Sequence, residues 1–265
     1  MEDRIINTSQ PASELVYELP LNERLRTFLR LETLFSETDH HLCGDKEIDT
    51  RAAVRALLSI MMIFSRPELK TEFLKEMDRL CTSLSKYSEV DGVDISRLSN
   101  IREELTIVAR NLRNLDGQIA ASLKHNEFLN AIKQRESVPG GAMAFDTPMY
   151  AHWLRQSCDY KTEQIRLWLQ EFEYVRQALT LSLSLIRSAG EFKTNLAKNG
   201  TYSEALDTSI PYQMIRINVA SNLAVFPEIS GGRHRFTVRF LELKGTDRPT
   251  LVEIDVPFEV TCCAL

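Results

Sequence analysis

The amino-acid sequence predicts an α+β protein with a mainly helical domain and a smaller antiparallel β-domain. Before residue 190, long stretches repeat apolar residues at intervals of three or four, the period of an amphipathic helix. After residue 210 the period falls to two, as expected of strands with one buried face. A short apolar run closed by a proline, at residues 15–20, predicts one further strand that joins the C-terminal sheet.

This change of period sets the expected domain boundaries. We expect the helical domain to span residues 21–205, and the β-domain to combine residues 14–20 with residues 206–265. Residues 1–13 are polar, contain Pro11 and predict a flexible tail. The long successive helices favour an antiparallel bundle or a dimer formed through helices.

Breaks in the helical pattern place the individual helices. Asn22 is a suitable N-cap for the first, whose apolar face runs to Phe35, and residues 36–50 look like a polar connection. A Pro-Gly-Gly loop at 139–141 ends helical structure, and a new helix starts at Pro148 because proline suits the first helical position. Further helices are expected over residues 51–64, 69–84, 98–115, 119–135 and 160–188.

The C-terminal strands carry an alternating run of arginines. Residues 233–243 place arginines on one face, after a turn-rich connection at 227–232, and are expected to form a hairpin with residues 252–260. A plausible register pairs the arginines with acidic residues of the facing strand, as cross-strand ion pairs. The arginine face is therefore either neutralised within the sheet or available to a partner.

Composition excludes several classes of function. A net charge of −5 argues against whole-protein affinity for nucleic acid or an anionic membrane. The most apolar run, residues 56–64, is about half the roughly 20 residues needed to span a bilayer. No basic segment followed by an apolar one opens the chain, and none of the five cysteines forms a Cys-x-x-Cys motif. These features predict a cytoplasmic protein without a disulfide framework.

No catalytic signature is present in the sequence. Phosphate-binding loops, the dinucleotide fingerprint, the nucleophile elbow and the zinc-protease motif are all absent. His40 and His41, with Asp39 and Cys43, suggest a metal site, but adjacent histidines lack helical ligand spacing and a solvated loop is expected. Residues 262–265 formally match a prenylation box, yet without a basic cluster they are read as a strand end. We expect a binding protein that is not an enzyme and needs no cofactor or metal.

The basic residues indicate the function more specifically. Arg26 and Arg30 are four positions apart on the first predicted helix, and no acidic residue lies three or four positions from Arg30. A solvated arginine and an anionic partner explain this equally well. Lys133 and Arg135 precede the Pro-Gly-Gly loop, and His152 is either a half-buried histidine or a ligand contact.

Several ungapped blocks follow one another along nearly the whole chain. They are ELPLNERLRTFLRLE at 18–32, TEFLKEMDR at 71–79, SVPGG at 137–141 with FDTP at 145–148 and WL at 153–154, and FPEISG at 226–231 with RF at 235–236 and 239–240. In these blocks, and in the cysteine pair at 262–263, the sequence resembles the ZapD family. These are bacterial division proteins that associate with the tubulin-like FtsZ.

The resemblance implies a homodimer in which each protomer binds the C-terminal tail of FtsZ in a basic pocket between the two domains. Such a dimer would crosslink and bundle FtsZ filaments and so stabilise the Z-ring at mid-cell. Arg30 matches the family arginine thought to contact the tail. The further candidates for tail binding are Arg26, Lys133, Arg135, His152, Arg233, Arg235 and Arg239.

Two positions depart from the family pattern. Ala151 stands where the family form has a histidine, and Glu127 stands where it has an arginine. They leave open which residues make up the pocket. The alternative function is a nucleic-acid-binding protein that uses the arginine face of the C-terminal sheet, which the acidic facing strand and the negative net charge oppose.

Overall fold

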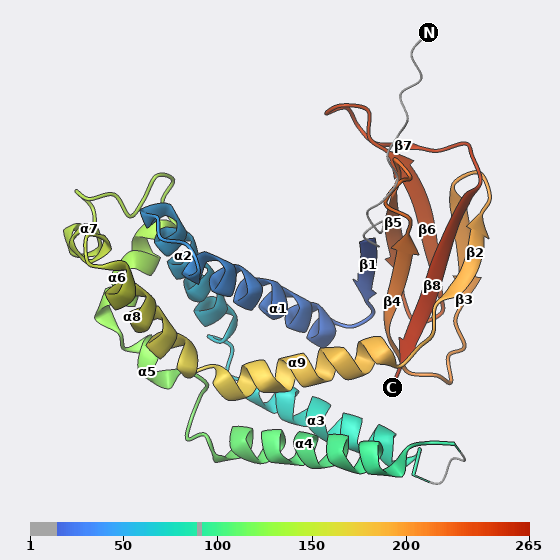
Figure 1. Ribbon diagram of the computed structural model, residues 1–265, viewed down its shortest axis with the longest axis horizontal. Coiled ribbons are helices and arrows are strands. Elements are labelled where there is room, and N and C mark those ends of the chain that lie inside the picture. Colours follow the sequence, from blue (N-terminus) through green and yellow to red (C-terminus); the bar gives the residue numbers. More distant parts are fainter. Residues whose placement is uncertain (1–14, 89–91) are drawn as a thin grey trace. The chain divides into compact units, whose positions relative to one another are not determined.

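The computed structural model of the chain describes residues 15–88 and 92–265 and confirms the α+β class (Figure 1). Contacts between residues divide the chain into two compact units. We call residues 26–184 the helical unit, and residues 1–25 with 185–265 the β-unit. The predicted flexible tail at 1–13 lies outside the described residues.

Helices make up most of the helical unit. Within the described part of the chain, none of them combines the length and apolar character that a membrane crossing requires. Their bounds are α1 (Glu23–Leu42), α2 (Glu47–Ile63), α3 (Leu69–Ser85), α4 (Ile95–Asn114), α5 (Ala121–Lys124), α6 (Glu127–Glu136), α7 (Pro148–Leu154), α8 (Cys158–Gln170) and α9 (Glu173–Ser188).

Asparagine side chains start two of these helices. The Asn22 side chain accepts a hydrogen bond from the backbone N–H of Leu25 at 2.8 Å, which confirms the predicted cap of α1. Asn126 does the same for α6, accepting from the N–H of Leu129 at 3.0 Å. Because this second cap interrupts the helical pattern, the single helix predicted over 119–135 is wrong, and α5 and α6 replace it.

The polar connection predicted over 36–50 is also wrong. Helix α1 continues to Leu42, because the buried face that includes Phe35 extends one turn further to Thr38, and α2 already begins at Glu47. The hydroxyl of Thr38 donates to the carbonyl of Leu34 at 2.8 Å, so a polar residue is accommodated inside the helix without a lost hydrogen bond. The helix predicted over 160–188 is likewise two helices, α8 and α9, separated at the buried Phe172.

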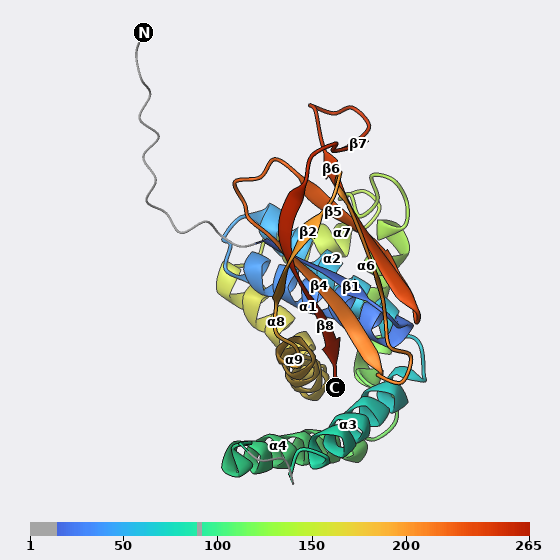
Figure 2. The ribbon, with the colours of Figure 1, turned by 90° about the vertical axis from the view of Figure 1, so that its right-hand side faces the viewer.

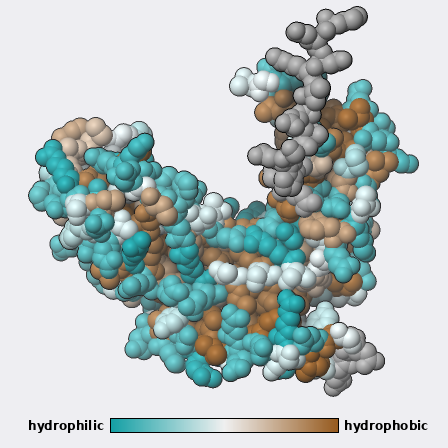
Figure 3. Space-filling view, in the orientation of Figure 1, coloured by the Kyte–Doolittle hydropathy of each residue, from teal (hydrophilic) through white to brown (hydrophobic). Residues whose placement is uncertain are grey.

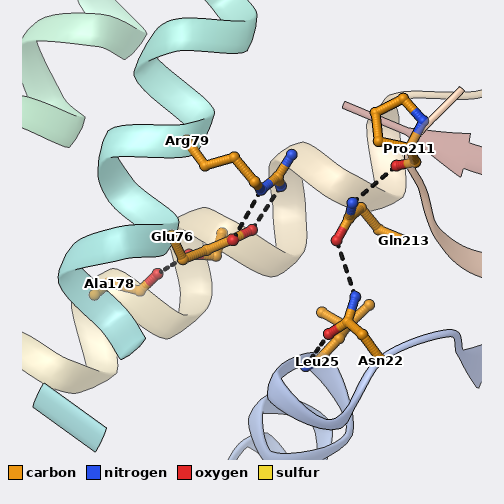
Figure 4. Close-up of polar contacts among 8 residues, drawn as sticks. Asn22, Leu25, Glu76, Arg79, Ala178, Pro211 and Gln213 are labelled. Carbon is orange, nitrogen blue, oxygen red and sulfur yellow. Dashed lines mark hydrogen bonds and ion pairs between the residues drawn. The ribbon is translucent and has the colours of Figure 1, made fainter. Parts of the chain in front are cut away.

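Apolar and polar contacts together hold the helical unit. The rings of Phe28 and Phe73 stack at 4.3 Å between centroids, and α3 and α4 lie side by side in both views (Figures 1 and 2). One carboxylate is fully inside this packing, because Glu76 has only 1% of its side chain exposed. The guanidinium of Arg79 donates to it at 2.9 and 2.6 Å, which compensates the buried charge (Figure 4).

The β-unit is a sandwich of two antiparallel sheets. One sheet has the order β1-β4-β8-β2, and the other has the order β3-β6-β5, with β7 paired to β6. The strands are β1 (Leu15–Pro20), β2 (Lys193–Ala197), β3 (Thr201–Ala205), β4 (Tyr212–Val219), β5 (Phe226–Gly231), β6 (Arg235–Glu242), β7 (Thr250–Leu251) and β8 (Val256–Ala264).

Alternation of side chains builds the core of this sandwich. Phe236, Val238 and Phe240 of β6 are completely buried, and they pack in one cluster with the inward residues of β4 and β8. The predicted inward face of β6 is therefore confirmed, and the arginines of this strand point to the opposite face.

The predicted hairpin between residues 233–243 and 252–260 forms only near its turn, where Leu241 of β6 pairs with Leu251 of β7, and it is wrong for residues 252–260. Strand β8 pairs with β4 and β2 in one sheet, whereas β6 pairs with β3 and β5 in the other. The period of two predicts which face of a strand is buried, but it does not predict which strand lies beside it. In a sandwich, strands of both sheets turn their apolar side chains to one core, so two such strands need not be hydrogen-bonded to each other. Strands β2 and β3 lie within residues 193–205, which are expected in the helical domain but belong to the β-unit. Strand β5 lies in the segment predicted to be a turn-rich connection.

The N-terminal strand joins the C-terminal sheet, as predicted. Leu15 pairs with Val219 and Leu19 pairs with Ile215 in an antiparallel register. Just after β1, the Asn22 side chain donates to Oε1 of Gln213 at 3.0 Å, and Gln213 in turn donates to the carbonyl of Pro211 (Figure 4). These bonds attach the beginning of α1 to β4 within the β-unit.

Candidate functional site

An arginine from beyond α2 contacts α1 one turn from Arg30. The guanidinium of Arg66, just after α2, donates to the hydroxyl of Thr27 at 3.3 Å. Arg30 lies one turn further along α1 on the same side of the helix, and Arg26 lies one turn before it. Among the described residues, the exposed Arg30 side chain forms no ion pair or hydrogen bond. Its charge is therefore available to a partner.

Lysines extend this positive surface towards α6. Lys124 and Lys133 line one hollow of about 200 Å³, together with Phe64 and Ser65. Ser65 is the neighbour of Arg66 in the chain, so the hollow lies one residue away from that arginine. Lys133 is exposed and has no polar partner in the part of the chain that the structure describes.

We call this set of cations in the helical unit the basic surface. Its carriers lie on α1, at the end of α2, on α5 and on α6, so tertiary packing assembles it. The basic surface comprises Arg26, Arg30, Arg66, Lys124 and Lys133.

Two predicted residues of the helical unit do not line its hollow. Arg135 is exposed two positions beyond Lys133 on α6, where a helix turns its side chain to another direction. His152 lies on the exposed side of α7, opposite the buried Tyr150 and Trp153, and among the described residues the one polar contact of its ring is with Gln156, at 3.3 Å. The prediction of a half-buried histidine is wrong, because α7 turns that side chain to solvent.

The three predicted arginines of the β-unit lie at or on the outer face of the sheet that contains β6. Arg239 pairs with Glu228 of β5 at 3.2 Å, with about half of each side chain exposed. The predicted partner of Arg239 is Asp255 of the facing strand, but Asp255 instead accepts a hydrogen bond from the backbone N–H of Asn199. Arg233 and Arg235 are exposed and have no side-chain partner among the described residues. Two of these three cations are thus free and one is neutralised.

Sequence reasoning did not find Arg66 and Lys124. Arg66 precedes Pro67 at a break between helices, which marks a helix end and carries no indication of binding. Lys124 lies in the short helix α5, and its ammonium contacts the side chain of Gln118. Only tertiary packing places Arg66 against Thr27 of α1 and Lys124 beside Lys133.

Histidine and cysteine side chains near the end of α1 contact other protein groups. His41 lies 3.4 Å from a carboxylate oxygen of Asp49, Asp39 forms an ion pair with Arg176, and the Cys43 thiol donates to a backbone carbonyl. Within residues 15–88 and 92–265, no three histidine, cysteine, aspartate or glutamate side chains gather as metal ligands would.

The adjacent cysteines near the C-terminus are part of β8. Cys262 pairs with Ile215 and Cys263 with Met214, so both are held within the sheet. Burial raises the pKa of each thiol to about 11 from the usual 9.0. Cys262, the residue that a prenylation box would modify, is half-buried and paired within β8, as expected of a strand end.

We expect these two thiols to resist alkylation in the native protein. A pKa raised by two units lowers the thiolate fraction at mildly basic pH by about a hundredfold, and burial slows access further. Treatment with iodoacetamide, followed by mass spectrometry of the peptides, should label the exposed Cys43 at least about tenfold faster than Cys263. Unfolding in urea should remove the difference. Equal native labelling of both would show that the end of β8 opens readily.

Comparison with known proteins identifies what the chain resembles. The family model for ZapD, described as a cell division protein, matches residues 29–239. The Cell division protein ZapD of Methylococcus capsulatus is 36% identical over 253 residues, covering 96% of this chain and 99% of the relative. Those of Nitrosomonas eutropha and Aromatoleum aromaticum are 32% and 34% identical, over 95% and 94% of this chain and 100% and 97% of the relatives.

Proposed function

Because the chain belongs to the ZapD family of cell division proteins, we propose that it binds the C-terminal tail of FtsZ through the basic surface and, as a homodimer, crosslinks FtsZ filaments. It would act in the cytoplasm at the mid-cell division site, where bundled filaments stabilise the Z-ring. The proposed role is non-enzymatic and needs no cofactor or metal.

The unpaired charge of Arg30 is the observation that carries the proposal. Arg30 has no acidic partner among the described residues, and it lies one turn from Thr27, which accepts a hydrogen bond from Arg66. The two arginines therefore offer two planar donor groups to a carboxylate ligand. Lys133 adds a flexible cation beside the neighbouring hollow. An extended acidic peptide fits such a row of cations, because its carboxylates can meet them one after another.

Each contact of this kind is weak by itself. An exposed ion pair contributes about 0.2 to 1 kcal/mol and is screened within about 8 to 10 Å at physiological salt. Two equivalent sites on a homodimer that faces a filament of many tails convert this weak binding into avidity. We therefore expect bundling to fall steeply as ionic strength rises.

The test is co-sedimentation of the full chain with GTP-assembled FtsZ, either intact or lacking its C-terminal tail. Arg30→Glu is expected to lower co-pelleting with intact FtsZ by about tenfold in apparent affinity, because it replaces an attraction with a repulsion. Arg110→Glu is the matched control, since Arg110 is also an exposed helical arginine without a side-chain partner among the described residues. It should change binding by less than about twofold.

Several outcomes contradict the proposal. Bundling that survives Arg30→Glu, or that is equal with tail-less FtsZ, would place binding elsewhere. The free arginines of the β-unit are tested on their own by Arg235→Glu, which separates their contribution from that of the helical unit. Sedimentation equilibrium of the chain alone tests the homodimer.

A further inference from the structure

An apolar groove lies next to the basic surface in the helical unit. Its volume is about 410 Å³, and it is lined by residues of α2 and of α6 with its C-cap. Lys133 borders both this groove and the smaller hollow of the basic surface, so the two are neighbours across a single lysine. In Figure 3, hydrophilic and apolar atoms are mixed over the end of the unit that carries α6 and α7.

The polar atoms of the groove are already engaged. The hydroxyl of Ser59 donates to the carbonyl of Arg55 at 2.9 Å, and the hydroxyl of Ser137 donates to the carbonyl of Gln134 at 2.8 Å. The guanidinium of Arg55 pairs with Glu136 at 2.9 Å. A ligand thus finds few free donors in the groove itself, and the charge left unpaired at its edge is that of Lys133.

Apolar side chains form the rest of the groove. Leu58 is buried, with 6% exposed, whereas Met62 has 59% of its surface exposed. A flexible thioether on the surface adapts to the shape of an aliphatic side chain placed against it. The groove therefore combines an apolar wall with one available positive charge.

We propose that this groove holds a bulky aliphatic side chain of the bound peptide, beside a carboxylate that pairs with Lys133. The inference rests on the proposed function, and it adds a requirement to it. Acidic residues alone would bind only the basic surface, whereas an aliphatic residue next to an acidic one would fill the groove as well. Specificity for one acidic segment over others then comes from apolar contact, which salt does not screen.

Short labelled peptides test this directly by fluorescence anisotropy with the full chain. One peptide is a glycine–serine segment with two aspartates flanking a leucine, and the other has serine in place of that leucine. Their charges are equal, so we expect the leucine peptide to bind about tenfold more tightly by burial of its side chain alone. The same ratio is expected at low and at high salt, although both affinities fall.

Substitutions locate the effect in the groove. Met62→Ser should abolish the difference between the peptides, while Met149→Ser, which changes a 48% exposed methionine on α7 outside the groove, should preserve it. Lys133→Gln should weaken both peptides. Equal binding of the two peptides, or a difference that persists in Met62→Ser, would overturn the inference.

A second ligand series separates this inference from the proposed function. Synthetic FtsZ tail peptides, with each aliphatic residue replaced in turn by serine, should show one position whose replacement reproduces the loss seen with Met62→Ser. If the tail binds and no such position exists, the groove inference fails while tail binding stands. If the tail does not bind but the leucine peptide does so selectively, the groove inference stands and the proposed function fails.

Discussion

Replacing Glu18 with alanine is expected to lower the free energy of unfolding of the β-unit by about 3 to 5 kcal/mol. The carboxylate of Glu18 is 16% exposed and accepts two hydrogen bonds from Arg187, both at 2.8 Å, and one from Arg216 at 3.0 Å. Removing it takes this shared carboxylate away from both guanidiniums, which are 28% and 17% exposed. Arg216 keeps a bond to the carbonyl of Arg187, which does not compensate charge.

The measurement must report on the β-unit separately. Both tryptophans of the chain, Trp153 and Trp168, lie in the helical unit, so tryptophan fluorescence does not follow β-unit unfolding. Hydrogen exchange of the β1 amides that pair with β4 does follow it, and tryptophan fluorescence serves as the internal reference.

The matched control is Glu228→Ala, which breaks an ion pair of the same kind at the surface. Glu228 and Arg239 are 56% and 50% exposed, so the expected cost is below about 1 kcal/mol. If the two substitutions had equal effects, the three-residue cluster around Glu18 would contribute no more than a surface ion pair.

Gly141→Ala is expected to destabilise the helical unit by about 3 kcal/mol. A Cβ at this position would lie 1.7 Å from the carbonyl oxygen of Arg135 and 2.8 Å from that of Val138. Both are backbone atoms at the end of α6, and the N–H of Gly141 also donates to Val138 at 2.7 Å. The loop can accept a methyl group only by moving away from the helix.

Urea unfolding followed by tryptophan fluorescence measures this loss, because the fluorophores are in the same unit. Gly140→Ala provides the control. Gly140 has a φ of +71° but no atom within 4 Å of its would-be Cβ, so only the backbone preference is lost, at about 1 kcal/mol. A Gly141→Ala protein as stable as Gly140→Ala would show that the loop is not held tightly against α6.

The sequence predicts the fold class and most elements, because periodicity is a local property. The alternation around Phe236 and the cap at Asn22 are visible without any knowledge of partners. Strand pairing is not local, and the predicted hairpin failed because β6 and β8 face the same core from different sheets. The short strands β2 and β3 have exposed residues at most positions, so they carry no period strong enough to predict them.

In the candidate site, too, the residues that could be predicted are those marked by local sequence. Arg30 could be singled out because the absence of an acidic neighbour on its own helix is a local fact. Arg66 could not, since its place beside Thr27 depends on how α2 packs against α1. The apolar groove between α2 and α6 was also beyond prediction, because Met62 lies in a run that resembles a buried helix and its exposure is decided by packing.

The pairing of β1 with β4 joins segments that are made at very different times on the ribosome. Leu15 leaves the ribosome just over two hundred residues before its partner Val219. All of residues 26–184 are synthesised in that interval, so the helical unit can acquire its contacts first. The sheet order β1-β4-β8 can be completed only after β8 has been made, so β1 is without its partner strand during most of synthesis and exposes backbone groups that another chain could pair with.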